Sequence, residues 1–348
     1  MIGERINAAR KAAGISTKEL GARIGLSAMT ISNYERGRST PSSDVLLRLS
    51  KALGRRVEFF FRGELPTIER LSYRKRSTLG KKETDRIIQG ILEKAERLIE
   101  AIKINSPKES RFECPLSFRL NSIDETENIA NDLRDAWELG SAPIGGLVQT
   151  VESKGILVLT SDYATSQFDG FAALINGFPV IAIGSDWPGD RQRFTIAHEL
   201  GHLIFHGRIC PDIDEERACN RFAGAFLIPK DEFKKRIQSP DQVNETALSL
   251  IKQEFGISQQ ALIFRASDLG IISLEKAKSL QAALKQKGFH IKEPGPEIPF
   301  EKSDLLIKKS LDSLKNGIIS PGKCAELLGI DIFDLKDFIR RPLGNHNH

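Results

Sequence analysis

Apolar and polar positions in the first part of the chain alternate with the spacing of short helices. Leu20, Ile24 and Ile31 fall where the inner faces of two neighbouring helices would share a small core. A glycine begins the tight turn between these helices, and Ser27 is a suitable N-cap for the second one. Amphipathic segments on either side complete a five-helix pattern over residues 1–63.

A longer amphipathic pattern follows. Residues 74–104 predict a basic loop and then one long helix. Four residues form its apolar face: Ile87, Ile91, Leu98 and Ile102. Three roles fit this helix: packing on a neighbouring domain, holding two domains apart, or pairing in a homodimer.

The rest of the chain predicts a small sheet among helices. Residues 155–159 form a strand-like apolar run, whereas residues 193–206 and a stretch ending at Pro229 repeat apolar positions at helical spacing. Residues 292–300 are rich in Pro and Gly and predict a linker before two or three small helices. The predicted fold class is α+β, predominantly helical and multi-domain. Four regions are expected: a helical domain at 1–63, a basic loop and helical connector at 64–122, a domain with the small sheet at 123–290, and a linker with small helices at 291–348.

Charge separates the regions. Residues 1–63 hold twelve Lys and Arg against five Asp and Glu, whereas the net charge of the whole chain of 348 residues is only +5. A basic N-terminal region on a mildly acidic remainder fits a phosphate-binding module fused to a separate domain.

The segment RFTIAHELGHLIFH, residues 193–206, contains the strongest chemical signal. His198 and His202 are four residues apart, so on a helix both imidazoles reach one metal ion. Glu199 lies beside them, close enough to accept a proton from a metal-bound water. The pattern indicates a metal-assisted hydrolase with Zn²⁺ as cofactor, one per chain. A buried helix with two incidental histidines is the weaker alternative.

Catalytic zinc needs a third protein ligand. Four acidic residues crowd the start of the next helix: Asp212, Asp214, Glu215 and Glu216. We prefer Glu216, because Asn220 lies one turn later on the same face and could hydrogen-bond a metal-bound imidazole. Glu215 is the alternative ligand. His206 fits a contact to substrate or to the metal ligands, and equally a partly buried structural role.

At this point a family resemblance becomes specific. The segment 193–206, followed by ERACNRFAGAFLIP at residues 216–229, resembles the ImmA/IrrE family of metallopeptidases. Further segments agree, and the resemblance as a whole covers roughly residues 123–273. The resemblance implies a gluzincin-like zinc peptidase fold in which His198, His202 and Glu216 bind metal and Glu199 is the base. It also implies a protein substrate, a repressor of the helix-turn-helix type.

The N-terminal pattern has its own resemblance. Residues 16–37, with TISNYERG at residues 30–37, are similar to the XRE (Cro and phage repressor) class of helix-turn-helix domains. This resemblance implies that the helix at residues 27–36 enters the major groove of a double-stranded DNA operator. A small helical domain used only for protein contacts is the alternative.

The same resemblance divides the DNA-contacting residues into two groups. The residues expected at base edges, with the cap that begins their helix, are Ser27, Ala28, Met29, Ser32 and Asn33. Ala28 and Met29 cannot donate paired hydrogen bonds, so apolar contact with thymine methyl groups is expected there. The residues expected at phosphates are Thr17, Lys18 and Arg38.

Composition limits the cellular setting. The chain has no apolar run of 18 residues, so no membrane span is expected, and its charged start does not read as a signal peptide. Its four cysteines lack the spacing of a zinc ribbon or a disulfide framework. This favours a protein of the reducing bacterial cytoplasm, of bacterial or phage origin.

Taken together, these patterns predict a DNA-binding transcription regulator fused to a zinc endopeptidase that cleaves a partner repressor, in a stress response or in a mobile element. A regulator whose metal domain senses a ligand or docks a partner without proteolysis is the first alternative. One component of a toxin–antitoxin pair is the second.

Overall fold

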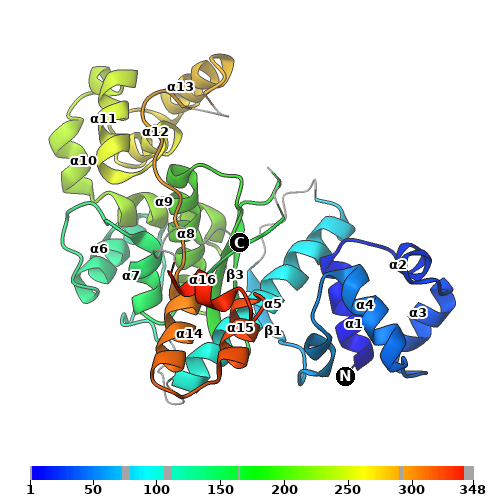
Figure 1. The fold of residues 1–348 in the computed structure, drawn as a ribbon. Helices are drawn as coiled ribbons and strands as arrows, with labels where there is room; N and C mark the ends of the chain where they lie inside the picture. Colours follow the sequence, from blue (N-terminus) through cyan, green and yellow to red (C-terminus); the bar gives the residue numbers. More distant parts are fainter. Residues whose placement is uncertain are drawn as a thin grey trace.

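The structure is a computed structural model that describes residues 2–72, 79–105, 112–163, 165, 167–289 and 293–340. A helical lobe at the N-terminus lies beside a body in which helices cover a small sheet (Figure 1). The fold class is α+β and predominantly helical, as predicted. Among the described helices, none has the length and apolar character needed to span a bilayer.

The N-terminal lobe consists of short capped helices around one core. Its elements are α1 (Ile2–Ala12), α2 (Thr17–Ile24), α3 (Ala28–Glu35), α4 (Ser43–Leu53) and the 3₁₀ turn η1 (Val57–Phe61). A reciprocal capping box between Ser16 and Glu19 begins α2. At the start of α3, the Ser27 hydroxyl accepts a hydrogen bond from the Thr30 N–H at 3.0 Å. Leu20 and Ile31 are fully buried in the core, which confirms the predicted apolar spacing.

A four-stranded sheet forms the centre of the body. Its strands are β1 (Ile68–Ser72), β2 (Leu157–Thr160), β3 (Gly170–Ile175) and β4 (Phe178–Ile183), in the order β1-β3-β4-β2. Only β2 and β4 are parallel. Asn176 and Gly177 join β3 to β4 with φ of 50° and 77°, as a two-residue hairpin with right-handed strand twist requires.

Strand β1 was not predicted. It follows the N-terminal lobe directly and pairs antiparallel with β3, so it extends a sheet whose other strands begin at residue 157. The region expected as a loop and connector therefore contributes to the sheet itself. Residues 73–78, which include most of the predicted basic loop, lie outside the described residues.

The long helix α5 (Lys81–Asn105) packs on one face of this sheet. Ile87, Ile91, Leu98 and Ile102 are all buried, so the predicted apolar face is confirmed. Of the three roles that the sequence left open, packing on a neighbouring domain is the one seen here. In Figure 1 the helix lies beside β1 and β3 and reaches toward the N-terminal lobe.

The opposite face carries the larger helical layer. Its helices are α6 (Thr126–Ala136), α7 (Leu147–Ser153), α8 (Gly189–Phe205), α9 (Glu215–Leu227), α10 (Lys230–Arg236), α11 (Glu245–Phe255), α12 (Gln259–Asp268) and α13 (Leu274–Gln286), with short 3₁₀ turns η2 (Ile123–Glu125) and η3 (Pro240–Gln242). Aliphatic and aromatic side chains from this layer and from the sheet form one continuous core. Helices α8 and α9 lie at its centre.

The predicted linker near residues 292–300 is instead bound to the body. We call residues 293–303 the strap. The Glu293 carboxylate contacts the Lys252 ammonium at 2.8 Å, and Glu301 pairs with Arg193 on α8, with all four side chains buried. A Pro- and Gly-rich stretch resembles a linker, but buried ion pairs fix this one against the start of α8.

Three small helices follow the strap: α14 (Leu305–Lys315), α15 (Pro321–Leu328) and α16 (Leu335–Arg340). Helix α14 packs on α5, beside the lower end of the sheet in Figure 1. The final histidine-containing tail, residues 341–348, lies outside the described residues.

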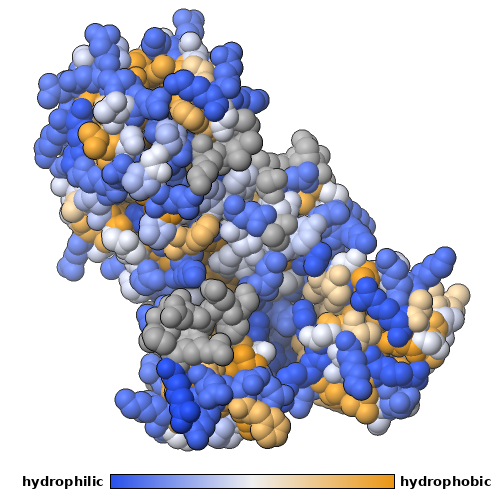
Figure 2. Space-filling view, turned by 45° about the horizontal axis from the view of Figure 1, so that its top comes forward, coloured by the Kyte–Doolittle hydropathy of each residue, from blue (hydrophilic) through white to orange (hydrophobic). Residues whose placement is uncertain are grey.

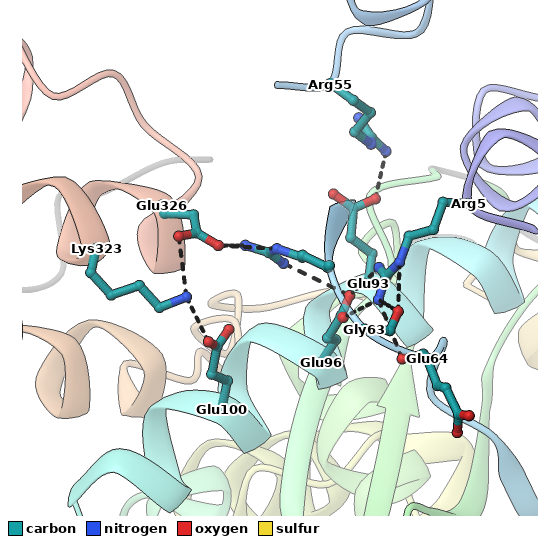
Figure 3. A network of polar contacts seen from close by, with 10 residues as sticks. Arg5, Arg55, Gly63, Glu64, Glu93, Glu96, Glu100, Lys323 and Glu326 are labelled. Carbon is teal, nitrogen blue, oxygen red and sulfur yellow. Dashed lines mark hydrogen bonds and ion pairs between the residues drawn. The ribbon is translucent and has the colours of Figure 1, made fainter. Parts of the chain in front are cut away.

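A polar junction joins the N-terminal lobe to α5 and α15 (Figure 3). The Arg5 guanidinium is buried and donates to both carboxylate oxygens of Glu96 at 2.6 and 2.8 Å. Arg62 donates to Glu326 at 2.7 Å, and Lys323 joins Glu326 to Glu100. The lobe and the sheet have separate apolar cores, and these charge pairs connect the two across the contact between α1 and α5.

The surface reflects this division. The lobe stands apart from the body in Figure 2, and much of the outer surface is hydrophilic. A recess of about 560 Å³ lies where the lobe, α5 and α15 meet, and Arg62, Glu96 and Lys323 are among its lining residues.

The junction gives a stability prediction. Glu96→Ala leaves the buried Arg5 guanidinium without its carboxylate partner, so the free energy of unfolding should fall by about 3 kcal/mol. Urea denaturation of the full chain measures this change. Glu93→Ala is the matched control, because Glu93 pairs with the more exposed Arg55, and it should cost less than about 1 kcal/mol. Equal losses in the two variants would contradict a special role for the Arg5 pair.

Candidate metal centre and DNA-contacting helix

Helix α8 is held firmly at its first turn. Gly189 lies so close to the strap that an added Cβ would sit 2.0 Å from the Pro299 carbonyl oxygen. In the same turn, the Asp190 carboxylate pairs with the buried Lys252 at 2.6 Å. These contacts fix the start of the helix whose middle section holds the candidate site.

The two predicted histidines share one face of α8. Their Nε2 atoms are 3.2 Å apart, and both side chains are buried. A helix places residues i and i+4 one above the other, which accounts for the convergence of His198 and His202. Both rings present a nitrogen to the same point in space.

Helix α9 brings a carboxylate to that point because it packs closely on α8. Gly201 makes the approach possible: an added Cβ would lie 3.2 Å from the Cys219 Sγ and 3.3 Å from its Cα. One Glu216 oxygen is then 3.6 Å from His198 Nε2, and the other is 3.3 Å from His202 Nε2.

These three residues make a donor set that fits one metal ion. The ligand atoms of His198, His202 and Glu216 all lie within 4.8 Å of one another. Two imidazole nitrogens and one carboxylate are a donor set used by catalytic zinc sites, which keep a further position for water. The Glu216 side chain is 43% exposed, so the site is reached from the α9 side.

The other nitrogen of His202 faces a different carboxylate. Its Nδ1 lies 2.9 Å from a Glu215 oxygen. When a metal ion is bound at Nε2, Nδ1–H donates to Glu215, and the lone pair of the ring on Nε2 is directed toward His198 and Glu216. Glu215 and Glu216, which the sequence left as alternatives, thus lie on opposite nitrogens of one ring.

Electrostatics at His202 favour positive charge. Burial alone would lower the pKa of this imidazole, but hydrogen bonds to Cys219 and Glu216 and the charge of Glu199 raise its pKa to about 11. Burial raises the pKa of the neighbouring Cys219 thiol to about 11 as well.

Glu199 is buried beside the histidines and close to strand β3. A Cβ added at Gly170 would lie 3.5 Å from Glu199 Cγ and 2.7 Å from Thr195 Cγ2, so the strand passes directly over this part of α8. Only 2% of Glu199 is exposed. A carboxylate in this position can accept a proton from a water held between it and the metal ligands.

Two further predicted residues lie near the site. Asn220 is half-buried on α9 and makes no hydrogen bond to either imidazole among the described residues; Glu215 makes that contact instead. His206 ends α8 and is exposed, so the partly buried structural role does not apply and a contact with substrate stays a prediction.

The candidate DNA-contacting residues cluster on α2, α3 and the turn that follows. All of them are half-buried or exposed: Thr17, Lys18, Ser27, Ala28, Met29, Ser32, Asn33 and Arg38. Met29 is 67% exposed, whereas Ile31 on the inner face is fully buried. Figure 1 shows α2 and α3 on the side of the lobe away from the body, and α1 on the side facing α5.

Some contributors to the site had no recognisable signal in the sequence. Gly201 and Gly170 permit close packing around the histidines and Glu199, and the Lys252–Asp190 pair anchors the start of α8. The side chain of Cys219 is buried, and the structure places it against His202.

Comparison with known proteins agrees with both resemblances. The family model described as "IrrE N-terminal-like domain" matches residues 151–267, and the model described as "Helix-turn-helix" matches residues 6–60. The chain therefore contains a helix-turn-helix segment of the XRE type and an ImmA/IrrE-like peptidase-family segment, as predicted. Histidines 198 and 202 and Glu216 lie within the second segment.

One curated protein is similar to a short part of the chain, and one solved structure can be compared over most of its length. Repressor protein C2 of Salmonella phage P22 is 40% identical over 65 residues, which are 19% of this chain and 30% of the repressor. The chain thus matches under a third of that protein's length. The crystal structure of Bacillus thuringiensis PlcR in complex with the peptide PapR7 and DNA is 12% identical, covering 97% of this chain and 90% of that one, with a TM-score of 0.19.

Proposed function

We propose that this chain is a transcription regulator whose N-terminal lobe binds a DNA operator and whose body is a zinc-dependent endopeptidase that cleaves a partner repressor. The observation that carries the proposal is the convergence of His198, His202 and Glu216 beside the buried Glu199, in a chain that also has a helix-turn-helix segment. Both activities need access to DNA and its regulators, so we assign the protein to the bacterial cytoplasm.

The chemistry follows from the donor set. One zinc ion per chain would be held by His198, His202 and Glu216, and when bound it polarises the scissile carbonyl and lowers the pKa of water. Glu199 takes the proton from the attacking water and returns it to the departing amine. Glu215 accepts the Nδ1–H of His202, which keeps Nε2 directed at the site.

The DNA-binding half uses α3 as its reading helix. Ala28, Met29, Ser32 and Asn33 would meet base edges, while Thr17, Lys18 and Arg38 would meet phosphates. Domains of this type commonly bind as dimers on paired half-sites, and we propose a homodimer on the operator. The junction involves α1 and Arg62, which directly follows η1, and it leaves α3 accessible, so DNA binding does not require the lobe to detach.

Two substitutions test this assignment. Asn33→Ala should reduce discrimination by about 1–3 kcal/mol at one base pair, because a bidentate contact to adenine is lost. Lys18→Ala should weaken binding to all sequences alike and reduce the salt dependence, since one phosphate contact disappears. The measurement is selection of duplexes from a random library by the full chain, followed by fluorescence anisotropy at several salt concentrations. Identical effects of the two variants would contradict the division into base and phosphate contacts.

A further inference from the structure

The Nδ1 side of His202 has its own set of metal-binding atoms. A ring nitrogen of His202, a carboxylate oxygen of Glu215 and the Sγ of Cys219 all lie within 4.8 Å of one another, and the Glu215 oxygen is 2.9 Å from Nδ1. Glu215 and Cys219 are four residues apart on α9, so both side chains project from one face of that helix toward α8.

The geometry points to a second cation site at His202, Glu215 and Cys219, which takes a soft divalent metal ion and competes with the first site for the His202 ring. The first site offers two nitrogens and a carboxylate, whereas the second replaces one nitrogen with sulfur. Thiolate donors favour soft ions, so the two sites differ in the metal that they prefer. Cys219 and His202 are buried, and the 43% exposure of Glu215 provides the route of entry.

Competition follows from the chemistry of imidazole. A neutral imidazole has one nitrogen with a hydrogen and one with a lone pair. An ion on Nδ1 therefore places the remaining hydrogen on Nε2, facing His198 and Glu216. In this step the S–H bond of Cys219 and the Nδ1–H bond of His202 break: the thiol proton leaves to solvent, and the ring hydrogen is exchanged through solvent to Nε2. Sulfur and Nδ1 each form a bond to the metal, and no oxidation occurs.

The consequence is a regulatory one. A soft ion on the Nδ1 side removes His202 from the first site. The first site then has only two protein ligands, His198 and Glu216. We infer that such ions switch off the metal centre, and this part of the inference rests on the proposed function. The existence of the second site does not rest on the proposed function, since metal binding there needs only the three donor atoms.

Cadmium is a suitable probe, because a cadmium–thiolate bond has an ultraviolet charge-transfer band. Metal-free full chain titrated with Cd²⁺ should develop this band with an intensity equal to one thiolate per chain. Cys219→Ser should abolish the band. Cys210→Ser is the matched control and should retain it, since the Cys210 thiol lies against Arg119 and Asn121 rather than a histidine.

A second pair of variants separates the two sites. Glu216→Gln removes a donor of the first site only, so the cadmium band should persist, whereas Glu215→Gln should weaken cadmium binding by at least about ten-fold. Wild-type protein preloaded with Cd²⁺ should bind Zn²⁺ at least about ten-fold more weakly than metal-free protein, because His202 is occupied.

Three results would overturn the inference: a band that survives Cys219→Ser, a band that disappears in Glu216→Gln, or zinc affinity that cadmium leaves unchanged. Circular dichroism of each variant shows whether it is folded, and Glu216→Gln changes a half-exposed side chain by one atom. A wild-type protein that shows the cadmium band but cleaves no protein would contradict the proposed function and leave the second site in place.

Discussion

Glu199→Gln should stop proteolysis while the fold, the metal and DNA binding persist. Glutamine has the size of glutamate and can still hold a water by hydrogen bonding, but it cannot accept that water's proton. Loss of a general base reduces a rate by about 10²–10⁴-fold, and a base acting on the attacking water is expected at the upper end. Because the three metal-binding residues are unchanged, zinc content should equal that of wild type.

The measurement follows a candidate repressor encoded next to this chain's gene. Immunoblots and a reporter of the repressed genes are compared for wild type and Glu199→Gln, with zinc content and DNA affinity measured on the purified proteins. Glu275→Gln is the control, since it makes the same chemical change on the exposed surface of α13. If Glu199→Gln responds as wild type does, hydrolysis is not the output, and the metal domain acts as a sensor or docking module.

The part of the site that lies on one helix could be predicted from the sequence. His198, Glu199 and His202 are neighbours on α8 because helical geometry alone fixes their relative positions. The third ligand could only be narrowed to two residues. Glu215 and Glu216 both lie in the first turn of α9, and the packing of α9 against Gly201 decides which nitrogen of His202 each one faces.

Contacts between segments far apart in the sequence were the ones missed. Strand β1 has the sequence IERLS, without clear alternation, and it exists through backbone pairing with β3 about a hundred residues later. The strap looks like a linker because of its Pro and Gly residues. Its buried Glu293 and Glu301 depend on Lys252 and Arg193, and no local pattern indicates those partners.

Substitution of the three proposed metal ligands should have the second large effect, a loss of zinc binding. Wild-type protein should bind about one Zn²⁺ per chain through three protein ligands. His198→Ala and His202→Ala should abolish binding, because two remaining protein donors do not hold zinc tightly. Glu216→Gln should weaken zinc binding strongly, since an amide oxygen replaces a charged carboxylate ligand. Competition with a chromophoric chelator measures each affinity.

Glu215→Gln is the decisive comparison, because its side chain lies one position away and is exposed to the same extent, 43%. Its carboxylate contacts Nδ1 of His202 rather than the point where the Nε2 atoms converge. Loss of such a supporting hydrogen bond typically costs about 10–100-fold in metal affinity. The loss in Glu216→Gln should be larger, because it removes a charged ligand itself. Equal affinities in the two variants, or a greater loss in Glu215→Gln, would contradict the assignment of Glu216 as the third metal ligand.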